Sequence, residues 1–355
     1  MNLLAAHFPS WLNPEIIPGL PVRWYGLMYI FAFATAYILF RRQIKERNFP
    51  MNDDEVSGLF FSTILGLLLG ARLFSTLIYD TSGIYWREPW LIFWPFRNGK
   101  FTGLMGMSYH GGAIGGALGA MIYGKLKKFQ FRELADMLVA GIPLGFTFGR
   151  LGNFINGELY GRVTTGPFGL IFPHARELSA NSDLVRTAAA QAGITITGAT
   201  VNLPRHPSQL YEALFEGIVL WGIIWLWRNR KPVKGFLISL YFIGYGIFRF
   251  AIEYFREPDS DLGYRIVLAK DSLFTTLPKD IYYAFYHPLL SFSTGQILSF
   301  MMIIAGIVWF IICSAQADRV PVRIYSNEIG QKPVIDLAEK ASERNKRRKL
   351  RKKLR

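Results

Sequence analysis

Long apolar runs are the feature of this sequence that most restricts how the chain can fold. A helix needs roughly 20 mostly apolar residues to cross the hydrocarbon core of a bilayer, and several runs approach that length. Charged residues make up only 18% of the chain, whereas soluble domains carry about 25%. Its single cysteine, Cys313, excludes a disulfide scaffold. The sequence therefore predicts an integral membrane protein.

Seven segments are predicted to cross the membrane as helices, which gives an all-α, polytopic fold. They are residues 22–40, 57–79, 109–124, 134–150, 208–227, 235–255 and 295–314. Residues 1–20 lack the basic stretch of a cleavable signal peptide, so we expect them to lie at the outer membrane interface. Residues 21–314 are then one seven-helix membrane domain.

Lysine and arginine gather in alternate connections between these segments. Residues 41–47, 125–132 and 228–234 hold clusters of basic side chains, and the positive-inside rule places such loops in the cytoplasm. The N-terminus is then extracytoplasmic and the C-terminus cytoplasmic. The net charge of +15 is explained by this topology rather than by nucleic-acid binding.

Two regions outside the predicted spans have a distinct character. The polar outer connection at about residues 151–207 is expected to form a small extracytoplasmic cap. The tail, residues 315–355, ends in ERNKRRKLRKKLR and is predicted to be cytoplasmic and solvated. Binding of anionic lipid or nucleic acid by this tail is the alternative.

Ionisable residues inside the predicted spans indicate function, because a charge in the bilayer is costly. The residues Tyr245, Arg249, Glu253 and Arg256 recur at helical spacing, which places them along one helix face. An ion-pair ladder that only satisfies itself is the structural alternative. Such a ladder adds little net stability once desolvation is counted.

The stretch GRLGNFINGELYGR, residues 149–162, brings arginines, amides and glycines directly after an apolar span. We predict non-helical backbone here, at membrane depth, which persists only where it is buried in protein or lines a cavity. The Asn156–Gly157 pair favours a turn. An ordinary surface loop is the alternative.

Two further motifs bring polar residues to the start of predicted spans. His110 opens a glycine-rich segment whose spacing indicates close helix packing, and the positive end of a helix suits an anion; a structural role for His110 is the alternative. RHPSQLYE, residues 205–212, places Gln209 and Glu212 on one side of the next helix. Together these groups suit a phosphate-holding cavity that receives an anionic phospholipid head group.

The same motifs resemble those of the bacterial phosphatidylglycerol–prolipoprotein diacylglyceryl transferases. In chain order they are WYG (24–26), GAR (70–72), MSYHGG (107–112), GRLGNFINGELYGR (149–162), RHPSQLYE (205–212) and YGIFRFAIEYFREPD (245–259). The resemblance implies transfer of diacylglyceryl from phosphatidylglycerol to the thiol of the lipobox cysteine in a prolipoprotein signal peptide. Glycerol phosphate leaves and a thioether forms. It also implies a monomeric enzyme of the bacterial inner membrane, surrounded by membrane lipids, that needs no metal or cofactor.

The resemblance also assigns roles to single residues. Arg150 and Arg249 would hold the phosphate and neutralise it as it leaves. Further positions that match the family's phosphatidylglycerol-binding or catalytic residues are Tyr25, His110, Asn153, Gly157, Glu158, Tyr245 and Glu253.

Two questions stay open on the sequence alone. His110 is a candidate acceptor for the thiol proton, and a nearby arginine that lowers the thiol's own pKa is the alternative. We favour a role shared by the two, with His110 ranked below Arg150 and Arg249. A transporter of lipid or anionic solute is the competing function, because buried arginines and broken helices also build transport sites. An internal repeat, common in transporters, is not seen in this sequence.

Overall fold

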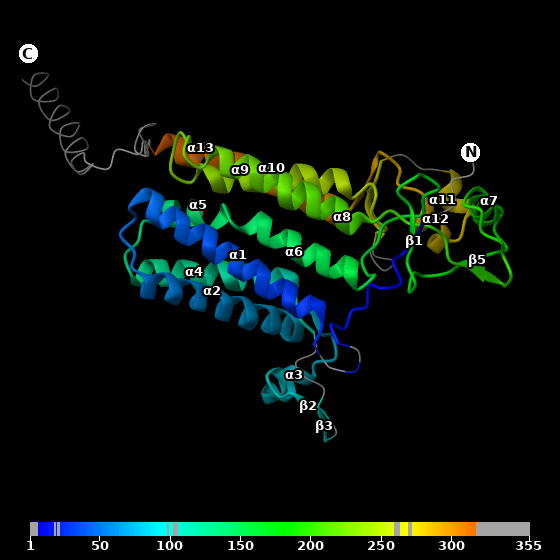
Figure 1. The fold of residues 1–355 in the computed structure, drawn as a ribbon, viewed down its shortest axis with the longest axis horizontal. Helices are drawn as coiled ribbons and strands as arrows, with labels where there is room; N and C mark the ends of the chain where they lie inside the picture. Colours follow the sequence, from blue (N-terminus) through cyan, green and yellow to red (C-terminus); the bar gives the residue numbers. More distant parts are fainter. Residues whose placement is uncertain are drawn as a thin grey trace, which may run out of the picture.

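The computed structural model describes residues 6–17, 19, 22–97, 99–101, 106–258, 263–268 and 272–316. Most of them lie in helices that run alongside one another in an elongated bundle (Figure 1). The bundle helices are α1 (Trp24–Arg47), α2 (Asp53–Phe74), α4 (Tyr109–Leu126), α5 (Phe131–Val139), α6 (Ile142–Ile155), α8 (Ser208–Glu212), α9 (Leu220–Trp227), α10 (Phe236–Ile252) and α13 (Thr294–Ala315).

Several of these helices suit a bilayer. Five helical segments of the described chain are long and apolar enough to cross a membrane, and α10 is a shorter apolar helix. Large apolar side chains such as Ile30, Phe61 and Phe300 face outward from the bundle, as expected where lipid is the solvent. The chain is therefore a mostly helical, multi-pass membrane protein. The five segments are Trp24–Arg47, Asp53–Tyr79, Phe131–Ile155, Ser208–Trp227 and Thr294–Ala315.

One predicted span is divided and extended. Helix α5 ends at Val139, and α6 begins at Ile142 with Pro143 in its first turn, where proline is tolerated. Helix α6 then continues to Ile155. The prediction of non-helical backbone from residue 149 was therefore wrong for the first half of that stretch.

Glycines let α2 and α4 approach backbone to backbone. Gly66 and Gly70 of α2 face Gly111 and Gly115 of α4, and a methyl group on Gly115 would overlap the Gly66 carbonyl oxygen. The pair lies side by side along one flank of the bundle (Figure 1). The helix-packing role predicted for these glycines is confirmed.

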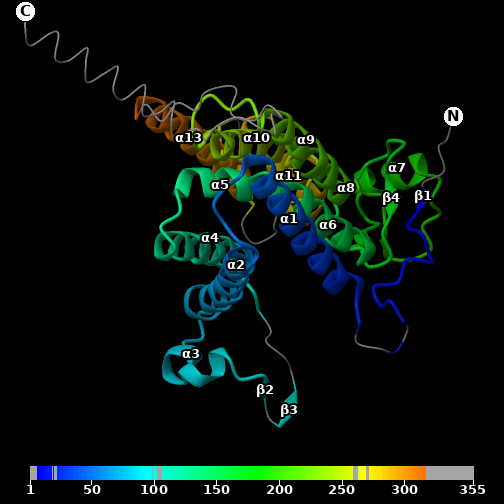
Figure 2. The ribbon, with the colours of Figure 1, turned by 60° about the vertical axis from the view of Figure 1, so that its left-hand side comes forward.

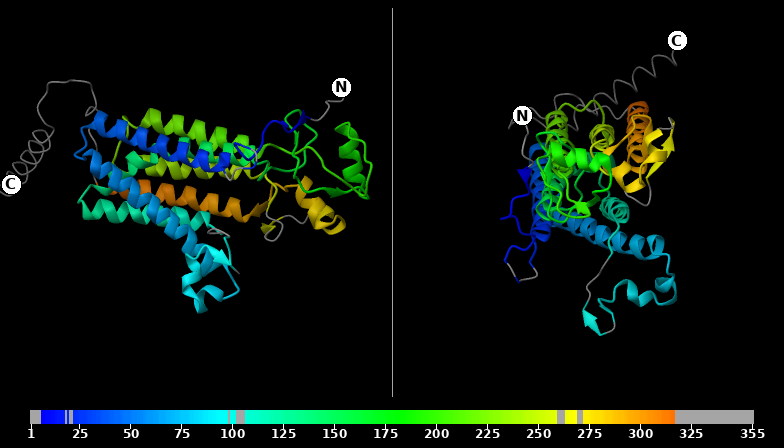
Figure 3. Two further views of the ribbon diagram at one scale, coloured as in Figure 1. Left: turned by 60° about the horizontal axis from the view of Figure 1, so that its bottom comes forward. Right: turned by 90° about the vertical axis from the view of Figure 1, so that its right-hand side faces the viewer.

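A smaller unit, the cap, lies at one end of the bundle (Figure 3). Its core joins Val163, Leu178 and Val185 to Ile281 and Ala284, so the second part comes from beyond the predicted range 151–207. Short strand pairs also occur, β1 with β4, β5 with β6 and β7 with β8, so the fold is not all-α in the strict sense. The cap elements are β1 (Ala6–His7), β4 (Leu170–Ile171), β5 (Leu178–Ser179), α7 (Asp183–Gln191), β6 (Thr200–Val201), β7 (Tyr264–Val267), α11 (Ser272–Thr276), α12 (Lys279–Phe285) and β8 (Ser291–Ser293).

A short arm leaves the bundle between α2 and α4 (Figure 2). It contains α3 (Ile84–Arg87), a 3₁₀ turn (Pro89–Ile92), β2 (Phe96–Arg97) and β3 (Lys100–Phe101). Arg72 of α2 donates to the backbone carbonyls of Leu91, Ile92 and Gly106. Arg72 thus fastens the arm to the bundle.

Candidate functional site

Three arginines and three glutamates gather where α6, α8 and α10 meet, near the cap. We call this group the arginine cluster. Arg150 comes from α6, Glu212 ends α8, and Arg249 comes from the last turn of α10. Its members are Arg150, Glu212, Glu216, Arg249, Glu253 and Arg256.

Glu212 is the centre of the cluster. Its side chain is fully buried, and its Oε2 lies 2.7 Å from Nε of Arg150. Its Oε1 accepts a hydrogen bond of 2.5 Å from Nη1 of Arg256 and lies 3.5 Å from Nη1 of Arg249. One carboxylate therefore joins three guanidinium groups from different parts of the chain.

The charged face predicted on α10 is present, but it is not self-contained. Nη2 of Arg249 lies 2.9 Å from Oε2 of Glu253, and Nε of Arg256 lies 3.7 Å from the same oxygen. Both arginines also pair with Glu212 on α8. Ser293 donates a hydrogen bond of 2.8 Å to Oε1 of Glu253. The ladder is thus one side of a cluster built by several helices.

A chain of hydrogen bonds leads from the cluster into the stretch 149–162. Nη1 of Arg150 donates to Oδ1 of Asn153 at 3.3 Å, and Nδ2 of Asn153 donates to Oε1 of Glu158 at 3.0 Å. Gly157 makes the turn between them with φ +66°, a conformation that favours glycine. Gln209 of α8 donates to the backbone carbonyl of Glu158 at 2.6 Å. These bonds fix the orientation of Arg150, and the predicted turn is confirmed.

An aromatic ring lies against the guanidinium of Arg150. The guanidinium lies 4.7 Å from the ring centre of Phe146, which packs edge to face against Tyr245. The Tyr25 ring contacts α6 at Gly152, and the Tyr25 and Tyr29 hydroxyl oxygens are 3.2 Å apart. The structure therefore brings Tyr25 and Tyr245 to the same region as the arginines.

His110 forms its hydrogen bond with a residue outside the arginine cluster. It is exposed at the start of α4, and its Nδ1 is 2.9 Å from the hydroxyl oxygen of Tyr79. Within the described ranges, neither a hydrogen bond nor an ion pair joins His110 to the arginine cluster. The sequence motifs grouped His110 with the arginines, but these contacts place it with the end of the α2 helical segment.

Three members of the cluster received no individual role from the sequence: Glu212, Glu216 and Arg256. Glu212 and Arg256 lie inside the motifs quoted above, and Glu216 follows RHPSQLYE by four residues. Glu216 lies in a π-helical segment (Ala213–Val219), one of the rarer helical forms, which is frequent at functional sites. The missing information was which face of this helix packs against α10.

The remaining basic residues of the motifs hold the cap. Arg162 donates to the backbone carbonyls of Tyr254, Tyr283 and Tyr286, and Arg205 pairs with Glu257. Burial, assisted by the charge of Arg162, lowers the pKa of His206. The His206 imidazole is therefore neutral at neutral pH and adds no charge beside the cluster.

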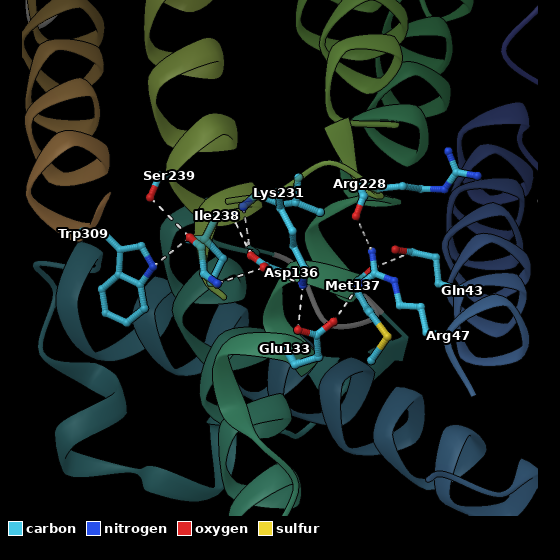
Figure 4. Close-up of polar contacts among 12 residues, drawn as sticks. Gln43, Arg47, Glu133, Asp136, Met137, Arg228, Lys231, Ile238, Ser239 and Trp309 are labelled. Atoms are coloured by element: carbon cyan, nitrogen blue, oxygen red, sulfur yellow. Dashed lines mark hydrogen bonds and ion pairs between the residues drawn. The ribbon is translucent and has the colours of Figure 1, made fainter. Parts of the chain in front are cut away.

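A second buried ion cluster joins α5 to the end of α1 and to the start of α10 (Figure 4), at the end of the bundle opposite the cap (Figure 1). Nζ of Lys231 is 2.7 Å from Glu133 and 3.1 Å from Asp136, and Nη1 of Arg47 is 2.8 Å from Glu133. Asp136 also accepts hydrogen bonds from the backbone N–H groups that begin α10, at Gly235, Leu237 and Ile238. The charges of this cluster pair with one another, and the pairs join α1, α5 and the start of α10. The cluster therefore holds these helices together.

Comparison with known proteins agrees with the sequence motifs. Residues 14–312 match the family described as Prolipoprotein diacylglyceryl transferase. The chain is 52% identical over 337 residues to Phosphatidylglycerol–prolipoprotein diacylglyceryl transferase of Treponema denticola, across 89% of this chain and 97% of that protein. The protein of the same name from Treponema pallidum is 48% identical across 90% and 99%. That from Chlorobaculum tepidum is 42% identical across 85% and 91%.

Proposed function

This chain belongs to the prolipoprotein diacylglyceryl transferase family and acts as a phosphatidylglycerol–prolipoprotein diacylglyceryl transferase, and we propose that the reaction takes place at the arginine cluster. Phosphatidylglycerol supplies the diacylglyceryl group, and the thiol of a prolipoprotein cysteine receives it. A carbon–sulfur bond forms, the bond from that carbon to the phosphate oxygen breaks, and the electron pair leaves with glycerol phosphate. The nucleophile therefore belongs to the substrate.

This placement rests on one difference in solvent exposure. Arg150 and Arg249 are partly exposed, whereas Glu212, the carboxylate that pairs with both, is fully buried. The side chains of Arg150 and Arg249 are 16% and 17% exposed, whereas Glu212 is 0% exposed. Guanidinium groups bind phosphate through fixed pairs of N–H donors. Fixed cations beside the leaving phosphate stabilise the charge that develops there. Arg150 and Arg249 are therefore the proposed phosphate-binding residues.

The other predicted residues would support these two. Asn153, Glu158 and Gly157 orient Arg150 through the hydrogen bonds and the turn described above, and Glu253 orients Arg249 through its ion pair. Tyr25 and Tyr245 offer aromatic surface against α6 at Gly152 and Phe146, the helix from which Arg150 comes.

His110 remains the proposed acceptor of the thiol proton. Because it lies with the end of the α2 segment, the acceptor peptide would have to lie between α4 and the arginine cluster. We expect His110→Gln to lower the transfer rate by about 100-fold, a typical contribution of a general base. A rate close to that of the unaltered enzyme would favour the alternative, in which the arginines lower the pKa of the substrate thiol.

The membrane arrangement extends this proposal. We infer seven spans in a bacterial inner membrane, with α4 and α10 as the additional two, the N-terminus and cap outside, and the C-terminus inside. The buried cluster around Lys231 and the basic connections lie at the other end of the bundle from the cap, as the positive-inside rule requires. Residues 6–8 contact the cap, in line with an outer N-terminal segment; the tail from 317 lies outside the described residues.

Mass spectrometry tests the proposed site. A synthetic lipobox peptide is incubated with the purified enzyme and phosphatidylglycerol, and the peptide mass is followed. We expect a gain of one diacylglyceryl group on the cysteine with the unaltered enzyme, and none with Arg249→Ala of equal folded content. Normal transfer by Arg249→Ala would refute the placement, and no adduct from the unaltered enzyme would favour the transporter and call for a lipid-flux assay.

A further inference from the structure

Glu216 is a buried carboxyl group whose environment differs from that of Glu212 and Glu253. It is 0% exposed, and within the described chain neither of its oxygens has a hydrogen-bond partner. Its ion-pair contact is with Nη1 of Arg249, 4.0 Å from Oε1. That nitrogen lies closer to Glu212, at 3.5 Å, and the other terminal nitrogen of Arg249 lies 2.9 Å from Glu253.

This arrangement makes Glu216 a poor place for a negative charge. Taking a carboxylate out of water costs several kcal/mol, which only close partners and hydrogen bonds repay. The positive charge of Arg249 is already shared with two nearer carboxylates. An uncharged carboxylic acid costs much less to bury than a carboxylate, so the site favours the protonated form of Glu216.

The charge balance of the arginine cluster leads to the same result. Three arginines and three ionised glutamates have a net charge of zero, and a bound phosphodiester would then make the site negative. With Glu216 protonated, the net charge is +1, which matches the single negative charge of a phosphodiester. In a low-dielectric environment charges interact strongly, so binding is favoured when the charge of the site cancels that of the phosphodiester.

We propose that Glu216 holds a proton when the lipid phosphate binds, and that this proton sets the charge of the site to match a phosphodiester head group. The proposal rests on the function proposed above and adds a positioning residue to it. Glu216 acts through Arg249: while it is neutral, it leaves the guanidinium free to turn toward the phosphate. When Glu216 loses its proton, it competes with the phosphate for Arg249.

The groups that face Glu216 come from its own helix and from the helices packed against it. Helix α9, with the sequence LWGIIWLW, brings no titratable side chain. The facing groups are Arg150 from α6, Glu212 from α8, Tyr241, Tyr245 and Arg249 from α10, and Arg256 beyond α10. The tyrosines stay neutral unless the pH becomes strongly alkaline, and arginine stays charged. Glu212 is held charged by its three arginine partners, which leaves Glu216 as the group that changes charge.

The pH dependence of KM for phosphatidylglycerol tests this assignment. In the unaltered enzyme, KM should rise as the pH increases and Glu216 loses its proton. Glutamine imitates the protonated acid, so Glu216→Gln should keep KM low and exceed the unaltered enzyme in kcat/KM at alkaline pH, by about tenfold for one charge in the site. Because the two enzymes are compared at the same pH, ionisation of the peptide thiol affects both rates equally. Two results would overturn the proposal. In one, KM of Glu216→Gln rises with pH as steeply as KM of the unaltered enzyme; in the other, KM of Glu216→Gln is higher than that of the unaltered enzyme at every pH.

A direct measurement covers the case in which the substitution perturbs folding. The infrared C=O stretch of a protonated carboxylic acid is recorded for the unaltered enzyme at neutral pH, for Glu216→Gln, and for Glu133→Gln as a buried, ion-paired glutamate outside the site. We expect the band in the unaltered enzyme and in Glu133→Gln and its loss in Glu216→Gln. Absence of the band from the unaltered enzyme would refute the proposal. This result is independent of transfer activity, so failure of the proposed function shows separately, as a missing peptide adduct.

Discussion

The substitution Arg249→Lys separates the charge of this residue from the shape of its guanidinium. Arg249 uses two terminal nitrogens: Nη2 lies 2.9 Å from Glu253, and Nη1 lies 3.5 Å from Glu212. Lysine keeps the positive charge but has a single nitrogen, so it cannot span both carboxylates and present a fork to a phosphate. If charge alone mattered, lysine would suffice.

The expected loss follows from the number of contacts. One hydrogen bond to a charged group contributes about 1.5–3 kcal/mol. If lysine loses one such bond in the transition state, kcat/KM should fall about 10- to 150-fold, since each 1.36 kcal/mol corresponds to tenfold. A larger loss would mean that Arg249 also orients the substrate.

The assay measures initial rates of diacylglyceryl transfer to a lipobox peptide over a range of phosphatidylglycerol concentrations. Arg47→Lys is the matched control, because Arg47 is also buried and paired with a glutamate, Glu133, at 2.8 Å. It lies in the cluster at the opposite end of the bundle. We expect Arg47→Lys to lower thermal stability and to leave kcat/KM of the folded enzyme unchanged. An Arg249→Lys enzyme with unchanged kcat/KM would refute the argument from guanidinium geometry.

Three further predictions concern stability. Asp136→Asn removes the charge that pairs with the buried Lys231 and should destabilise the fold by about 3–5 kcal/mol, measured by thermal unfolding in detergent; an unchanged transition would contradict a structural role. Gly115→Leu should prevent the close approach of α2 and α4 and reduce the yield of folded protein, whereas Gly222→Ala, with open space around it, should not; equal yields would count against the glycine contact. Burial, with the charge of Arg162, lowers the pKa of His287 from 6.5 to about 4, so the unfolded chain takes up this proton first and stability should fall as the pH drops through that interval. His287→Phe should reduce this loss, and an identical pH profile would argue against it.

Local spacing predicted one side of the site well. The recurrence of Tyr245, Arg249 and Glu253 every four residues specifies a shared helix face, because the period of a helix is a local property. The glycine spacing in α4 likewise predicted a close helix contact. The Asn156–Gly157 turn was predicted from two residues, and it lies where Gly157 has a positive φ.

Contacts between distant segments were not predictable in the same way. Glu212 meets Arg249 and Arg256 only because α8 packs against α10 in one register, and no single stretch of sequence contains that register. His110 was grouped with the arginines by chemical type, yet its hydrogen-bond partner is Tyr79. Gly149 and Gly152 suggested a break, whereas both lie within α6, and Gly152 packs against Tyr25 and Met28 of α1.

The number of residues in the π-helical segment Ala213–Val219 sets the orientation of Glu212 relative to α9, so the length of the segment is constrained as well as its side chains. The segment separates Glu212, which must face the arginines, from Leu220 and Ile224 of α9, which are fully buried. Each residue turns an α-helix by about 100°, so removing one residue would rotate α9 out of its core or Glu212 out of the cluster. Among natural variants of this chain, insertions and deletions should therefore be excluded between Glu212 and Leu220, even at the exposed positions Leu214 and Phe215.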